Sequence, residues 1–279
     1  MKYFLALIVS LLFSIAAIAQ DSLGFTNKAE AKNLIVNGLK EGKWVEYYDS
    51  AFTATKDTNA PFYHLSVYKS NKPEKIMHCY AKNGTLLQEI PFTDGKKNGV
   101  KKEYTKNRTL IRETPYTNDI INGLLKTYYE NGNVMSETPY INNSINGVGK
   151  QYNDSGKLTY EIPYTDGKIN GVKKGYDENG TLLSETPYTD DIKDGIEKIY
   201  YGDGNIEEEE PYTDDKLNGA LKNYYENGNT KYETPYVDGE INGTLKQYDE
   251  VGALKAETNY SYGVMGETIF YDKYGNVIK

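Results

Sequence analysis

The sequence has little of the side-chain chemistry that catalytic and metal sites need. It contains one cysteine (Cys79), two histidines (His64 and His78) and one tryptophan (Trp44). A single cysteine excludes an internal disulfide, so the fold must hold without a cross-link. We expect His64 and His78 to share a face of a sheet, but two histidines without a third ligand make a weak zinc pattern. His78 and Cys79 are neighbours on a predicted strand and point to opposite faces, which excludes a dyad between them. The residues therefore predict no enzyme activity, no cofactor and no metal centre.

The sequence also has fewer basic than acidic residues. The formal net charge is −8 and the calculated pI is about 5.0. An acidic chain is a poor ligand for nucleic acid and for anionic lipid surfaces. We therefore expect no nucleic-acid partner and no membrane binding.

Long apolar runs are absent after the first 20 residues. The run that does exist begins behind Lys2 and ends in Ala17-Ile18-Ala19, the small-x-small pattern of a signal-peptidase site. It is short for a membrane anchor and has no basic flank behind it. The sequence predicts a signal peptide at residues 1–19 and cleavage after Ala19. Export to the periplasm, the cell surface or the medium would follow.

Tyrosine and a strict period are what the sequence does contain. It has 28 Tyr against 7 Phe, and Tyr at that level favours strands and amphipathic surfaces. Proline, tyrosine, glutamate and lysine each recur every 24 residues, which is typical of a repeat architecture. The proline column is 91, 115, 139, 163, 187, 211 and 235, and ETPY recurs at 113–116, 137–140, 185–188 and 233–236.

The period predicts ten repeats over residues 42–279, preceded by an N-terminal cap segment at 20–41. About nine extra residues lie in a long loop of the first repeat, near 49–61, and the last repeat is one residue short near 261–266.

Each repeat reads as two strands, such as 99–104 and 109–116. A three-residue turn with glycine, such as Glu130-Asn131-Gly132, joins them, and a seven-residue turn such as 165–171 leads to the next repeat. Both connections are too short for a crossover helix, so consecutive strands are antiparallel. The predicted fold is all-β, an elongated single-layer antiparallel meander of about ten repeated β-hairpins.

The motif ETPY is interpreted as structural. Proline lacks a backbone donor, so Pro115 is expected to end its strand before the turn. Strand alternation is expected to place Lys102, Tyr104 and Tyr116 on one face and Glu113 on the other.

The pattern G-x-x-K-x-Y-Y-x-x-G-x-L-x-x-E-x-x-Y, read from Gly123 to Tyr140, resembles the MORN repeat and is most similar to its bacterial variant. The resemblance covers residue 42 to the end of the sequence. It implies a ribbon of hairpins, no enzyme activity, and a role as a scaffold or interaction surface. Some bacterial members carry an antitoxin label, and the resemblance makes an antitoxin-like protein one alternative.

The tyrosine columns and the flanking lysines are the candidate binding surface, because rigid rings with hydroxyls are typical of recognition surfaces. The alternative is that the rings only cover one another in a thin sheet. The candidate residues are Tyr104, Tyr116, Tyr128, Tyr140, Tyr152, Tyr164, Tyr176, Tyr188, Lys102, Lys126, Lys150 and Lys174.

A weaker candidate is a calcium site formed by Asp190, Asp191 and Asp194, since clustered carboxylates suit that ion. The alternative is that aspartate simply favours turns.

Together these observations predict an exported, non-enzymatic repeat scaffold that binds a protein partner through a Tyr- and Lys-lined face. A cell-wall or glycan-binding surface module, with tyrosines stacking on sugars, is the other alternative.

Overall fold

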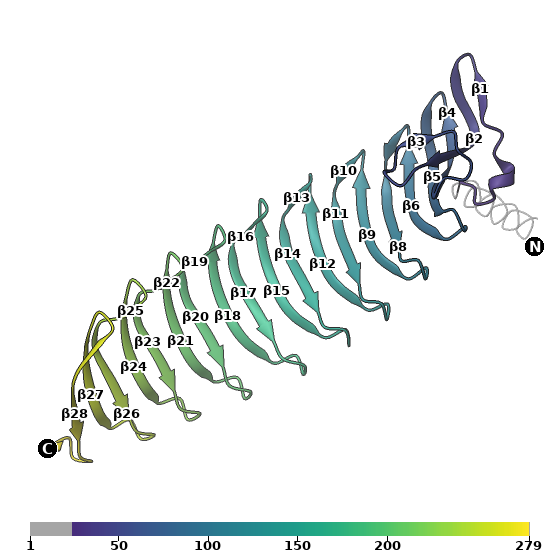
Figure 1. Cartoon of the computed structure of the whole chain (residues 1–279). Helices are drawn as coiled ribbons and strands as arrows, with labels where there is room; N and C mark the ends of the chain where they lie inside the picture. Colours follow the sequence, from purple (N-terminus) through teal and green to yellow (C-terminus); the bar gives the residue numbers. More distant parts are fainter. Residues whose placement is uncertain (1–23, 279) are drawn as a thin grey trace, which may run out of the picture. The chain divides into compact units, whose positions relative to one another are not determined.

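A computed structural model describes residues 24–278, so the predicted signal peptide at residues 1–19 lies outside the described residues. The chain divides into two compact units. The first holds the described residues up to Val134 together with Tyr140–Asn143, and the second holds Met135–Pro139 together with the residues from Ser144 onward. Within each unit, antiparallel strands lie side by side in chain order (Figure 1). The predicted all-β meander of hairpins is confirmed. None of the described helices is long and apolar enough to cross a membrane.

The first unit begins with a short 3-10 helix, Lys28–Glu30, and continues with strands. They are β1 (Leu34–Val36), β2 (Leu39–Tyr48), β3 (Ala54–Thr55), β4 (Phe62–Lys69), β5 (Lys72–Ala81), β6 (Leu86–Thr93), β7 (Lys96–Lys97), β8 (Gly99–Tyr104), β9 (Leu110–Thr117), β10 (Ile120–Ile121) and β11 (Gly123–Tyr128). β12 (Val134–Ile141) is divided between the two units.

The second unit continues the same alternation of long and very short strands. They are β13 (Ser144–Ile145), β14 (Gly147–Tyr152), β15 (Leu158–Thr165), β16 (Lys168–Ile169), β17 (Gly171–Tyr176), β18 (Leu182–Thr189), β19 (Ile192–Lys193), β20 (Gly195–Tyr200), β21 (Ile206–Thr213), β22 (Lys216–Leu217), β23 (Gly219–Tyr224), β24 (Thr230–Val237), β25 (Glu240–Ile241), β26 (Gly243–Tyr248), β27 (Leu254–Ser261), β28 (Val264–Tyr271) and β29 (Val277–Ile278).

The loop inside each repeat follows the predicted turn chemistry. In the loop after β17, Gly180 has a φ of 87° and its amide donates to the Asp177 carbonyl at 3.1 Å. Glycine adopts this left-handed backbone without strain, as the three-residue hairpin turn predicts. Arg108 is the exception, with a φ of 65° and the same hydrogen bond to the Thr105 carbonyl.

The connection between repeats differs from the predicted seven-residue turn. After β9 the chain turns at Asn118 and Asp119, whose φ angles of 52° and 71° are those of a two-residue hairpin turn. Residues Ile120-Ile121 then pair back onto Tyr116-Thr117 as the short strand β10. Asn and Asp tolerate this left-handed backbone better than other non-glycine residues, which explains the polar composition of these segments.

The predicted role of proline as a strand terminator is wrong. Pro115 lies within β9, opposite Val100, and its carbonyl accepts a hydrogen bond from the Asn122 amide at 3.1 Å. Its ring packs against Gly123, where an added Cβ would lie 3.2 Å from the ring atoms and where φ is 120°. The same Pro–Gly contact recurs in the second unit, for example between Pro187 and Gly195. The rings of the proline column therefore pack against the glycines that begin the following repeats.

The core is thin, as a one-sheet fold requires. In the first unit Phe25, Leu65 and Tyr80 form a buried cluster, on which Val45 and Tyr63 pack. In most of the later repeats the residue after the glutamate of the column is buried, as Thr114, Ile162, Thr186 and Thr234 are.

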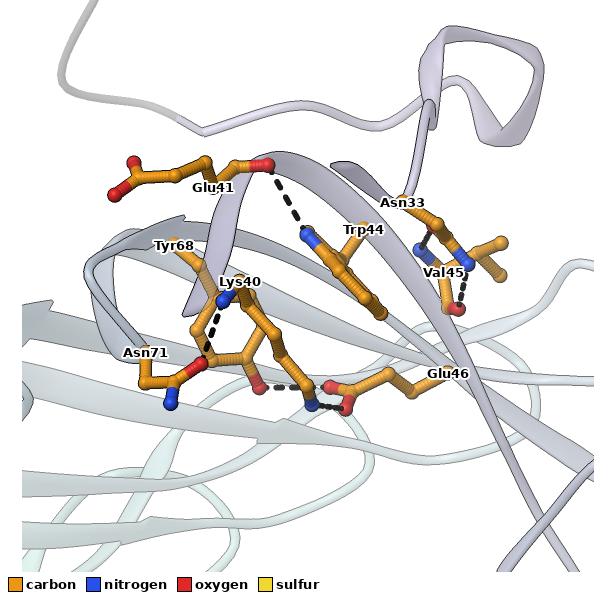
Figure 2. Close-up of polar contacts among 8 residues, drawn as sticks. All are labelled: Asn33, Lys40, Glu41, Trp44, Val45, Glu46, Tyr68 and Asn71. Carbon is orange, nitrogen blue, oxygen red and sulfur yellow. Dashed lines mark hydrogen bonds and ion pairs between the residues drawn. The ribbon is translucent and has the colours of Figure 1, made fainter. Parts of the chain in front are cut away.

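The free edge of β2 is covered by the residues that precede it (Figure 2). The Asn33 side chain donates to the Val45 carbonyl at 3.1 Å and accepts from the Val45 amide at 2.9 Å, as a neighbouring strand would. Within β2, Lys40 also forms an ion pair with Glu46. Glu46 accepts a hydrogen bond from the hydroxyl of Tyr68 on β4 at 2.8 Å.

Candidate functional site

Glutamate and lysine alternate across the strands in one directly opposed row, which we call the charge ladder. In the first unit the ladder is Glu89, Lys102, Glu113 and Lys126. In the second unit it is Glu137, Lys150, Glu161, Lys174, Glu185, Lys198, Glu209, Lys222, Glu233, Lys246 and Glu257. Each interior member stands between two residues of opposite charge.

The distances within the ladder allow ion pairing. Lys174 Nζ lies 3.0 Å from Glu185 Oε1, and Lys150 Nζ lies 3.4 Å from Glu161 Oε1. The lysine side chains remain about two-fifths exposed, so each pair contributes little by itself, on the order of 0.5 kcal/mol. The ladder as a whole removes the repulsion that a column of glutamates alone would create.

Tyrosine hydroxyls tie one repeat to the one before it. Tyr104 donates to Glu89 at 2.7 Å, Tyr128 to Glu113 at 2.7 Å and Tyr176 to Glu161 at 2.9 Å. The Tyr152 hydroxyl donates to Glu137 at 3.1 Å.

The titration of these groups reflects that contact. Burial, and then the hydrogen bond to Glu185, raise the pKa of Tyr200 to about 12. In return, the Tyr200 hydroxyl and then the Lys174 ammonium lower the pKa of Glu185. These tyrosines are therefore neutral donors to ionised carboxylates at neutral pH.

The expected single Tyr- and Lys-lined face is wrong, because the register divides it. Lys102 lies opposite Glu113, so the lysine, the glutamate and Tyr104 share one face, which we call the ladder face. Tyr116 is paired with Gly99 and lies on the opposite face together with Thr114. By the same alternation, Tyr128, Tyr152, Tyr176, Lys126, Lys150 and Lys174 belong to the ladder face, and Tyr140, Tyr164 and Tyr188 to the opposite face.

The tyrosines of the opposite face pack on their own sheet. An added Cβ at Gly149 would lie 3.0 Å from the Tyr164 ring, so that ring covers the glycine. The Lys97 ammonium lies 5.0 Å from the centre of the Tyr116 ring, within the range of a cation–π interaction. This arrangement agrees with the alternative in which the rings cover a thin sheet.

An exposed aliphatic row runs beside the ladder and was not singled out from the sequence. Val148, Val172 and Ile196 are 50%, 44% and 51% exposed in the second unit, each two residues before a ladder lysine. Each lies opposite a proline of the neighbouring strand. The apolar residue at this fixed position of the repeat was the signal that could have identified the row.

The aspartates proposed for calcium have structural contacts in the turn after β18. Asp191 Oδ1 accepts from the Ile169 amide at 2.6 Å, and Asp190 Oδ1 accepts from the Asn170 side chain at 3.0 Å. The Asp194 amide donates to the Pro187 carbonyl. Within residues 24–278, no group of three or more His, Cys, Asp or Glu side chains is placed to hold a metal ion.

The histidines do not share a face, contrary to expectation. His64 lies opposite Cys79, whereas His78 lies opposite Leu65 and Glu89 and occupies the ladder position that lysine fills in later repeats. Burial lowers the pKa of both histidines. Burial also raises the pKa of the Cys79 thiol to about 12, the reverse of what a nucleophilic cysteine requires.

The chain was compared with known families and proteins. The family described as MORN repeat variant matches residues 121–142, 145–166, 169–190, 193–214 and 217–238. These five tandem stretches are MORN repeats of the variant type, and half of the ten predicted repeats are thereby assigned to the family. No curated protein matches the chain. The MORN family is one of repeat scaffolds and interaction modules.

Proposed function

We propose that this protein is a non-enzymatic scaffold, exported from the cytoplasm, that binds a protein partner on its ladder face. The observation that carries the proposal is the exposed row Val148, Val172 and Ile196 beside the charge ladder in the second unit. Apolar side chains in a contiguous row on a monomer surface mark interaction sites.

The ladder face combines the elements of a recognition surface. Its aliphatic row supplies apolar area, and its partly exposed lysines and glutamates supply a polar border on one side of that row. Apolar contact at the centre with a polar rim is the usual anatomy of a protein interface. Because both signs of charge alternate along the ladder, it favours a partner surface of mixed charge over a polyanion.

The test is affinity capture from a cell-envelope extract with the chain from Gln20 to Lys279, followed by mass spectrometry. The variant carries Val148→Thr, Val172→Thr and Ile196→Thr, which keep β-branched side chains and place hydroxyls only at exposed positions. A control carries Gln151→Ser and Tyr160→Ser on the opposite face.

One protein retained by the native chain and the control, and lost by the threonine variant, would support the proposal. A protein retained equally by all three would overturn the assignment to the ladder face. Enrichment of wall glycan without a stoichiometric protein would overturn the protein-scaffold reading in favour of a glycan-binding module.

A further inference from the structure

The long loop of the first repeat forms one wall of a hollow on the opposite face of the first unit. The hollow has a volume of about 330 Å³. It is lined by Phe52, Phe62, His64, Cys79, Tyr80, Leu87 and Gln88. The stacked rings of Phe52 and Phe62 form its aromatic wall, and the directly opposed residues His64, Cys79 and Gln88 form its floor. This volume is at the lower end of the range for small-molecule sites.

The aromatic wall is held in place at a conformational cost. Phe52 stacks on Phe62 with ring centres 4.5 Å apart and planes 14° apart, yet it is 61% exposed and has a φ of 57°. A bulky residue in the left-handed region is a true outlier. The Phe52 amide donates to the Asp49 carbonyl, and the Thr53 amide donates to Asp49 Oδ1 at 2.9 Å, which fixes this strained turn. Strain of this kind is concentrated at functional sites.

The floor carries polar atoms without charge at neutral pH. His64 and Cys79 are directly opposed on β4 and β5, and Gln88 is opposite Cys79 on β6. Burial lowers the pKa of His64, although Glu46 opposes that shift, and burial raises the pKa of Cys79. Glu46 itself is engaged by Lys40 and Tyr68 (Figure 2).

The hollows of the second unit differ in character. One is lined by Glu233, Lys246 and Glu257 and another by Lys231, Glu226 and Glu250. Those surfaces suit charged or strongly hydrated groups, whereas desolvating a charge in the aromatic hollow of the first unit would be unfavourable.

We propose that the hollow formed by Phe52, Phe62, His64, Cys79, Leu87 and Gln88 binds a small uncharged aromatic molecule. The ligand ring packs against the phenylalanine wall and over the thiol, beside the imidazole on which the Tyr48 ring lies at 4.1 Å between ring centres. The Gln88 amide nitrogen donates to Glu103 at 3.2 Å, so its side-chain oxygen is the group that meets a polar substituent at the ring edge. This binding site is independent of the partner surface on the ladder face.

The test is titration of the full chain with indole and with 2-naphthol, followed by ligand-detected NMR. Indole-3-carboxylate serves as the charged comparison, and we expect it to bind about tenfold more weakly or worse because its carboxylate must be desolvated. Saturable binding of the neutral probes is the expected result.

Phe52→Gly is the principal variant, because glycine adopts the left-handed backbone without strain and the ring alone is lost. Tyr262→Gly is the matched control, since Tyr262 is also an exposed aromatic with positive φ, at 45°, in a different turn. We expect Phe52→Gly to weaken indole binding about fivefold or more and Tyr262→Gly to leave it unchanged.

A second variant, Leu87→Trp, places a large ring at the hollow. It should abolish saturable indole binding while circular dichroism shows a folded protein. Absence of saturable binding, equal binding of the carboxylate, or unchanged binding in both Phe52→Gly and Leu87→Trp would overturn the proposal.

Discussion

At the scale of single residues, each of the four residues of the motif ETPY has a different structural role. Glu185 is a ladder carboxylate and Thr186 is buried under the opposite face. The Pro187 ring packs against Gly195, the glycine that begins the following repeat, and Tyr188 lies opposite Lys193 of the short strand β19. Each role depends on one side-chain property, so substitutions at these positions should have separable effects on stability.

Glu185→Gln tests the ladder. The folded-state pKa of Glu185 lies below its ordinary value of 4.5, so its stabilisation is present above pH 4.5 and is lost as pH falls through the folded value. We expect the variant to lower the free energy of unfolding by about 0.5–1 kcal/mol at pH 7. The difference should vanish near about pH 2, where the native carboxyl is also neutral. Urea denaturation at both pH values measures it, with Glu178→Gln in an exposed loop as control. An equal loss at both pH values would show that the ladder charge is not responsible.

Gly195→Ala tests the Pro–Gly contact. The added Cβ would lie 2.9 Å from the Pro187 ring, and the backbone φ of 121° is strained for alanine. We expect a loss of about 2–3 kcal/mol in the free energy of unfolding. Gly204→Ala is the matched control, because its φ is also positive, at 91°, and no atom lies within 4 Å of its added Cβ, so it should lose only the part due to backbone strain, about 1 kcal/mol. Thermal or urea denaturation distinguishes the two, and similar values for both would contradict the packing role of the prolines.

At the scale of secondary-structure elements, the short strands and their two-residue turns fix how each repeat is aligned with the one before it. Asp119 and Asp215 each accept from the amide of a residue 22 positions earlier, Lys97 and Lys193 respectively, at 2.8 and 2.7 Å. In the first repeat the equivalent bond joins Lys40 and Asn71, 31 positions apart. The difference of nine residues is the extra length of the loop that carries Phe52.

Asp215→Ala and Asp215→Gly separate the two contributions of this turn residue. Alanine loses the carboxylate acceptor and must adopt a φ of 64°, whereas glycine loses only the acceptor. We expect the alanine variant to cost about 2 kcal/mol and the glycine variant about half of that. Glycine already occupies this position at Gly167 and Gly239. Chemical denaturation provides the measurement, and a glycine variant less stable than the alanine variant would contradict the argument.

The sequence predicted the elements well and their faces poorly, for a specific reason. The columns of proline, tyrosine and glycine mark the strands and turns, and short connections impose the antiparallel order. Which residues share a face depends on the count through each turn, and a bulge between Glu103 and Tyr104 shifts that count. A shift of one residue exchanges the faces of a strand, which is why Tyr116 and Glu113 were assigned to the wrong sides. The charge ladder is invisible until that register is known, because Lys102 and Glu113 are partners only across strands.

At the scale of the whole molecule, stability is a sum over similar repeats and their nearest neighbours. The ladder alternates pairs within one repeat, such as Lys174 with Glu185, and pairs between adjacent repeats, such as Glu161 with Lys174. The Pro–Gly pairs and the turn bonds of Asp119 and Asp215 join a repeat to an adjacent one. Removing one complete period therefore leaves equivalent partners for the residues on either side.

Deletion of residues 171–194 tests this additivity. It should bring Glu161 opposite Lys198 and the Ile169 amide to Asp215, and so restore both the ladder and the turn bond. We expect a folded protein with cooperative urea unfolding and a strand signal per residue close to that of the native chain. Deletion of residues 171–182 is the control, because it removes one long strand and reverses the direction of all that follow. Loss of the strand signal in the 24-residue deletion would contradict nearest-neighbour additivity.

The Asn33 side chain has a consequence for colloidal behaviour. A terminal strand normally offers unpaired amides and carbonyls on which strands of other molecules can nucleate a fibril. Here the Val45 amide and carbonyl are both occupied by one carboxamide, and the Lys43 carbonyl accepts from the backbone amides of Lys32 and Asn33. The Asn33 side chain thus forms the two hydrogen bonds that a peptide group of a neighbouring strand would form. In a concentrated solution of this tyrosine-rich protein, a strand of another molecule that approaches Lys43 and Val45 therefore meets backbone groups that are already hydrogen-bonded.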